Sequence, residues 1–200
     1  MKRLVIIAIL AAFCMGAQAQ EKLYTVKSGV VTMEMNMMGQ NIVQKIYFDD
    51  YGVKKATVSN FNGQDSRQIV VDGETVMVND AEKTAMKMPM MGMQETVNFS
   101  NLDEKTVKKY KVQELGKETV AGKECTKYQV TVMMMGQPQK QTVWVYKGVT
   151  LKSSSKSDFG DMTQTATKFE ENVEVPASMF VLPAGVKVEE MNMGMMGGGW

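Results

Sequence analysis

Apolar and polar residues alternate along almost every segment of this chain. In GVVTMEMNM, residues 29–37, methionine or valine occupies every second position, with Thr32, Glu34 and Asn36 between them. Successive side chains of a β-strand point to opposite faces of a sheet, so a period of two indicates half-buried strands. The same alternation occurs in IVQKIYF, TVMVN, KECTKYQVTVMM and KQTVWVYK. The sequence therefore predicts a mainly β fold.

Short turn sequences separate these segments. DDYG, NGQD, AGK and KG are turn clusters, and Asp72-Gly73 between QIVV and ETVMV is a strong hairpin signal. NGQD also resembles part of a calcium loop with Asn60, Asn62 and Asp65, but Val71 stands where the loop needs a glutamate, so we interpret it as a turn. Such spacing predicts an antiparallel meander of about ten strands, not a parallel βαβ sheet.

One segment is typical of a helix. SNLDEKTVKKY, residues 100–110, offers Ser100 or Asn101 as the N-cap, acidic residues in the first turn and lysines near the end. We predict a short helix that crosses one face or edge of the sheet. VPASMF, residues 175–180, predicts one further helical turn before Pro183 and Gly185 end regular structure.

The first 19 residues have the pattern of a secretory signal peptide. Lys2 and Arg3 precede an apolar run at 4–13, and Ala17-Gln18-Ala19 is a cleavage signal that predicts a cut before Gln20. The apolar run is shorter than the roughly 20 residues that cross a bilayer. We therefore expect a soluble, exported protein of the bacterial periplasm or outer envelope, without a transmembrane segment.

The remaining sequence predicts one domain and a tail. Residues 20–190 are expected to form a single antiparallel β domain, and residues 191–200, MNMGMMGGGW, a flexible tail rich in methionine and glycine. Without Lys2 and Arg3, 21 basic residues of the original 23 face 22 acidic ones, a net charge of −1. This balance argues against nucleic acid or an anionic membrane surface as the partner.

Catalysis is not expected. The chain has no histidine, which removes the commonest general base and metal ligand. No phosphate-binding glycine loop or nucleophile elbow occurs either. Cys125 is the only cysteine left after cleavage and lies in a predicted strand, so we interpret it as a buried apolar residue. We predict a protein that is not an enzyme and needs no cofactor.

Three segments resemble a known family. They are GKETVAGKECTKYQV (116–130), VWVYKGVTLK (143–152) and VPASMFVLPAGVKV (175–188). They are similar to those of a methionine-rich bacterial envelope family of unknown function, whose expected architecture resembles the periplasmic lipoprotein carriers and receptors of the outer membrane. The resemblance implies a curved antiparallel sheet that forms an incomplete barrel, with helices on its concave side and apolar chains between them.

Methionine is the unusual component of the chain. Residues 20–200 contain 19 methionines and five leucines, although a rigid core favours Leu, Ile and Val. Flexible methionines can form an adaptable surface for apolar partners. Our first hypothesis is therefore a concave groove that holds an apolar small molecule, a lipid or a lipidated chain. The predicted ligand-binding residues are Met33, Met35, Met37, Met86, Met88, Met90, Trp144 and Tyr146.

Two alternatives remain open at this point. Thioethers are ligands for the soft ions Cu(I) and Ag(I), and the tail offers Met191, Met193, Met195 and Met196. Alternatively, the methionines fill an ordinary core, and the protein has a structural role or binds an envelope protein partner. The sequence does not distinguish a methionine-lined cavity from a methionine-filled core.

Overall fold

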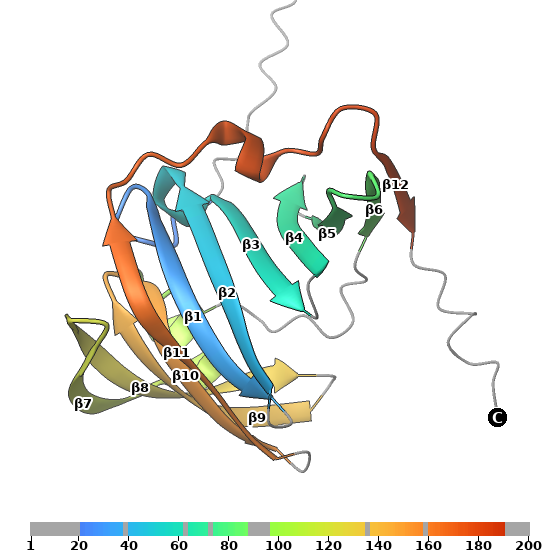
Figure 1. Ribbon diagram of the computed structural model, residues 1–200. Coiled ribbons are helices and arrows are strands. Elements are labelled where there is room, and N and C mark those ends of the chain that lie inside the picture. The colour runs from blue at the N-terminus through green and yellow to red at the C-terminus, as the bar shows by residue number, and fades with distance from the viewer. Residues whose placement is uncertain are drawn as a thin grey trace, which may run out of the picture.

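The computed structural model describes residues 21–37, 40–61, 64–71, 74–87, 97–134, 137–157 and 160–190. These residues form one curved sheet of twelve strands (Figure 1). The strands are β1 (Gly29–Met37), β2 (Gln40–Asp49), β3 (Lys54–Phe61), β4 (Gln64–Val71), β5 (Glu74–Asn79), β6 (Thr84–Lys87), β7 (Gln113–Val120), β8 (Lys123–Met134), β9 (Gln137–Tyr146), β10 (Val149–Ser157), β11 (Gly160–Glu171) and β12 (Lys187–Glu190). The predicted β fold is confirmed, with two strands more than expected.

Two meanders build the sheet. Strands β1–β6 form one, β7–β11 form the other, and antiparallel pairing of β1 with β11 joins them. All neighbouring pairs are antiparallel except β12, which runs parallel to β6 at the sheet edge. This parallel pair has no clear signal in the sequence, because Pro183 and Gly185 interrupt the segment just before the short strand. The open edges at β12 and β7 make the sheet an incomplete barrel.

A short helix follows the first meander. Helix α1 spans Glu104–Tyr110, and Asp103 caps it by accepting a hydrogen bond from the Thr106 amide at 2.7 Å. The predicted helix is confirmed, but its N-cap is Asp103 and not Ser100 or Asn101. A carboxylate satisfies an unpaired amide and also interacts well with the positive helix N-terminus, which favours Asp103. The turn predicted at VPASMF is the 3₁₀-helix η2, Ala177–Phe180.

Strand register assigns side chains to the two faces of the sheet. Directly paired residues share a face, and the pairs Tyr128–Val143, Val143–Ser153, Ser153–Gln164 and Gln164–Met35 connect β8 with β1. Tyr128 packs with residues of α1, so we name this side the α1 face. In Figure 1, α1 lies behind β10 and β11, on the inner side of the curve.

The opposite side of β3–β6 is covered by the segment that connects β11 to β12. We name residues 172–186 the strap; the segment includes η2 and crosses the first meander to the far edge (Figure 1). Phe180 of the strap packs against Ala56, Ile69, Val76, Val78 and Ala85. We name this side the strap face. The first meander is thus covered by the strap on one face only.

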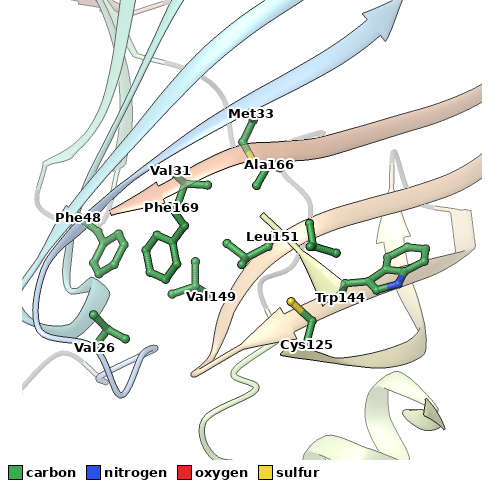
Figure 2. Packing of buried hydrophobic residues seen from close by; sticks show 11 residues of the cluster. Val26, Val31, Met33, Phe48, Cys125, Trp144, Val149, Leu151, Ala166 and Phe169 are labelled. Carbon is green, nitrogen blue, oxygen red and sulfur yellow. The ribbon is translucent and has the colours of Figure 1, made fainter. Parts of the chain in front are cut away.

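The largest apolar cluster lies where the two meanders meet. It contains Phe48 and Leu151, both fully buried, and Figure 2 shows Met33 beside Ala166 within it. Cys125 also belongs to this cluster and is a buried free thiol, as predicted. A smaller cluster joins Tyr110 of α1 to Val130 and Val132. Among the described residues, no helix has the length and hydropathy needed to cross a membrane.

Candidate functional site

The structure places Met33 and Met35, from the first predicted methionine group, on the same face as Met86, from the second, but far from it. Met35 pairs with Gln164, which fixes β1 on the α1 face. Val31 lies two positions before Met33 and therefore shares its face. A row of directly paired residues leads from Val31 across the sheet to Met86, through Ile46, Thr57, Gln68 and Met77. Five strand spacings separate β1 from β6, or about 24 Å along the sheet. Among the described methionines, Met86 therefore does not cluster with Met33 and Met35.

Met33 and Met35 fill the core. Their exposed fractions are 3% and 9%, and the amide nitrogen of Gln164 lies 3.4 Å from the Met35 sulfur. Both side chains are enclosed by protein atoms in this structure. For these two residues the arrangement is that of a packed core, the alternative that the sequence left open.

The far end of the same face is open. Met77 and Met86 are directly paired and are 41% and 40% exposed, and Val70 on β4 is 40% exposed. Val70 shares the α1 face, since it follows Gln68 by two positions. We name Val70, Met77 and Met86 the apolar patch. Large apolar side chains gathered on one exposed face are typical of an interaction site.

Sequence reasoning missed two residues of the apolar patch. Met77 lies in TVMVN and Val70 in RQIVV, two segments whose pattern predicts only strands. The usable signal was that the β4–β5 hairpin brings both residues beside the strand that carries Met86. The sequence does not show that the strap packs on the opposite face and so does not cover the α1 face.

The predicted aromatic residues lie at the central cluster that contains Met33, away from the apolar patch. Trp144 pairs with Lys152 and Lys127, on the side of β9 opposite to the neighbouring Val143, and belongs to the same buried cluster as Met33 (Figure 2). Its indole nitrogen donates to Glu118 at 2.7 Å. This hydrogen bond lowers the pKa of the Glu118 carboxyl. Trp144 is buried between the two lysines and has no open surface for a ligand.

Tyr146 is partly buried against the large central cluster. Its ring lies 6.1 Å from that of Phe169, and the Lys147 and Lys123 amines bind Glu171 nearby. These contacts give Tyr146 a packing role. The remaining predicted residues cannot be placed: the side chain of Met37 and the whole of Met88, Met90, Met191, Met193, Met195 and Met196 lie outside the described part of the chain.

A cavity of about 840 Å³ lies between the strap and the sheet. Strap residues Met179, Leu182 and Pro183 form one wall, and Tyr47 and Val58 form another. Asp65, Asp80 and Glu82 supply carboxylates. This cavity is on the strap face, so it is not the predicted methionine groove.

Arg67 organises the wall of this cavity and is itself buried. Its Nε and Nη2 atoms donate to Asp80 at 3.0 and 2.8 Å, and Nη1 donates to the carbonyls of Ser178, Met179 and Val181. These bonds lower the pKa of Asp80 and occupy the guanidinium on all three nitrogens. Arg67 is therefore committed to holding the strap. The described residues contain no group of three His, Cys, Asp or Glu side chains that could hold a metal ion.

The fold and the patch define a class of protein: an open, curved β-sheet with a helix on its inner face and an exposed apolar surface. The family comparison is more specific. Residues 28–179 match the model of the family described as "Domain of unknown function (DUF4412)", and the chain belongs to that family. The predicted family resemblance is confirmed. No curated protein sequence matches the chain.

Solved structures share the fold at low sequence identity. An uncharacterized conserved protein from Thermus thermophilus has a TM-score of 0.54 at 8% identity, over 83% of this chain and 91% of that one. MucB in the Pseudomonas aeruginosa MucA/MucB complex has a TM-score of 0.50 at 16% identity, over 79% of this chain. The match spans only 56% of the MucB chain. A putative outer membrane lipoprotein-sorting protein domain from Vibrio parahaemolyticus is more distant, with a TM-score of 0.36 at 13% identity, over 76% of this chain and 88% of that one.

Proposed function

We propose that this protein is a non-enzymatic binding protein of the bacterial envelope that holds a lipidic, apolar partner against the α1 face. One observation carries the proposal: Val70, Met77 and Met86 are exposed together on a face that the strap leaves uncovered. Full burial of a large apolar side chain contributes about 1.5–3 kcal/mol, and a partner that covers these three side chains gains the part that corresponds to their exposed fraction. Methionine adapts its shape to different partners.

The sequence supports the location. The charged and apolar pattern of residues 1–19 is typical of an export signal, which supports placement in the periplasm or outer envelope. MucB, which shares the fold, is found in a complex with MucA. A polypeptide that presents apolar side chains is therefore the alternative occupant that the experiment must distinguish.

The proposed site differs from the original groove in its residues. Met86 stays in it, Met77 and Val70 join it, and the buried Met33, Met35 and Trp144 leave it. The soft-metal hypothesis stays a prediction, because Met191, Met193, Met195 and Met196 lie outside the described residues. No observation on the described residues favours it.

Native mass spectrometry of protein purified gently from the periplasm tests the proposal. A lipid-sized adduct that is lost on denaturation, and whose amount falls when Met77 and Met86 are replaced by Ser, would support it. A bound polypeptide would support the alternative occupant. A bare polypeptide mass, together with no uptake of the neutral apolar dye Nile red, would contradict a binding function on this face.

A further inference from the structure

One charged residue lies on the open face beside the apolar patch. Lys55 on β3 pairs directly with Phe48 on β2. Phe48 shares its face with Ile46, and the paired residues Ile46, Thr57, Gln68 and Met77 define the α1 face here. Lys55 therefore lies on the same face as Met77 and Met86.

Its position next to the patch follows from the register of β3 and β4. Ala56 pairs with Ile69, so the next position along places Lys55 beside Val70. From Val70 on β4, Met86 on β6 lies two strand spacings across the sheet, about 10 Å, and two residues along it, about 7 Å. A cation and an apolar surface are thus adjacent on one side of the sheet.

The charge of Lys55 is isolated. Among the residues of β1–β6 whose side chains the structure describes, the register places no other charged residue on the α1 face; the residues there are Gly29, Val31, Met33, Met35, Ile42, Gln44, Ile46, Phe48, Thr57, Ser59, Ser66, Gln68, Val70, Thr75, Met77, Asn79, Thr84 and Met86. No carboxylate of the described chain forms an ion pair with Lys55, in contrast to the other side of the sheet, where Arg67 binds Asp80.

Burial makes this isolation costly. Lys55 is half-buried, and desolvation lowers the pKa of its ammonium group. Lysine is seldom buried without a partner, because removing the charge from water requires compensation. An anion brought to this position would supply that compensation and would itself be held by a charge-assisted hydrogen bond.

We propose that the α1 face binds an amphiphile with a single anionic head group, which pairs with Lys55 while its hydrocarbon chain lies over Val70, Met77 and Met86. This inference rests on the proposed function and names the chemical class of its ligand. The shared chemistry is an acyl or alkyl chain with a carboxylate or a phosphate at one end. A free fatty acid and a phosphorylated lipid both provide it.

The test compares amphiphiles that differ only in the head group. Displacement of Nile red, a neutral dye, is measured for dodecanoate, dodecyl phosphate and dodecanol on the purified mature chain. The wild type is expected to bind the anions roughly tenfold to hundredfold more tightly than dodecanol, as one charge-assisted bond provides. The tighter of the two anions distinguishes a fatty acid from a phosphorylated lipid.

Three variants assign this preference to Lys55. Lys55→Met should lose it and keep dodecanol binding, whereas Lys55→Arg should retain it. Lys54→Met is the matched control, since Lys54 is the preceding residue of β3, on the opposite face, where it pairs with Asp49. Circular dichroism and urea unfolding confirm that each variant is folded.

The outcomes separate the inference from the function on which it rests. A preference for the anions that Lys55→Met abolishes and Lys54→Met leaves unchanged supports the inference. Equal binding of anions and dodecanol by the wild type, or an unchanged preference in Lys55→Met, would overturn the role of Lys55. The proposal that the apolar patch binds a ligand would not be affected by either result. If neither Nile red nor any amphiphile binds the wild type, the proposed function fails, and the choice of head group fails with it.

Discussion

Arg67 binds both carboxylate oxygens of Asp80, through Nε at 3.0 Å and Nη2 at 2.8 Å, while its Nη1 donates to three carbonyls of the strap. Asp80 belongs to the turn after β5, so the Arg67 side chain on β4 connects that turn to strap residues that follow Arg67 by 111 to 114 positions. The strap in turn delivers β12 to its parallel position beside β6. This arrangement controls which face of the first meander is covered.

Replacing Arg67 by Met should therefore loosen the strap. The variant loses the hydrogen bonds to Asp80 and to the strap carbonyls, so we expect the free energy of unfolding in urea to fall by about 2–4 kcal/mol. Amide hydrogen exchange should accelerate first in residues 186–190, which depend on the strap. Arg67→Lys should rescue little, since an ammonium lacks the planar fork. Unchanged exchange in β12 would refute this role.

The two kinds of methionine should respond differently to mutation. Met33 is 3% exposed in the central cluster, so Met33→Ala should cost about 2–5 kcal/mol of unfolding free energy. Met86 is 40% exposed, so Met86→Ala should change the free energy of unfolding by no more than about 0.5 kcal/mol. Urea denaturation of both variants checks this contrast. Equal costs at the two sites would show that the assignment of core and surface is wrong.

The apolar patch should contribute to ligand affinity but not to the free energy of unfolding. Replacing Met77 and Met86 together by Ser should weaken Nile red binding by roughly tenfold or more, because two large apolar contacts are lost. Met133→Ser is the matched control, an exposed methionine that follows the inward-facing Val132 and so lies on the other face. Fluorescence titration gives the affinities. An equal loss in the control would point to nonspecific dye binding.

These contrasts show what the sequence could and could not predict. Alternation identified nearly all strands, because it depends on local backbone geometry. Which methionine is buried depends on remote segments: Met33 is enclosed where the two meanders join, whereas Met86 is open because the strap passes on the other side. Neither arrangement has a local signal. Trp144 was assigned to the site as an aromatic residue on the same strand face as Tyr146, but it is buried in the central cluster, with two lysines over its ring.

Cys125 should be inert in the folded protein. Its side chain is fully buried, and burial raises the pKa of the thiol, so both access and thiolate formation are suppressed. We expect a thiol-reactive dye to label native protein only as fast as it unfolds, and to label it fully in urea. Rapid stoichiometric labelling without urea would show an accessible cysteine.

Alkaline pH should destabilise the protein through Tyr24. The Tyr24 ring packs edge-on against Phe48 at 4.8 Å and lies so close to Gly52 that an added Cβ there would be 2.6 Å away. Burial raises the pKa of Tyr24 to about 12 from its ordinary value of 10.0. Between these two values the unfolded chain loses the phenolic proton while the folded chain keeps it, so stability is complete below pH 10 and falls as the pH rises.

The loss attributable to Tyr24 should reach roughly 3 kcal/mol across that interval, at about 1.4 kcal/mol for each pKa unit. Lysines also lose their charge in this range, so the informative quantity is the difference from Tyr24→Phe, which keeps the ring contacts and has no proton to lose. Urea denaturation at pH values on both sides of 10 measures it. Parallel stability curves for the two proteins would mean that the Tyr24 hydroxyl is solvated in the folded state, and that the N-terminal segment does not seal this end of the core.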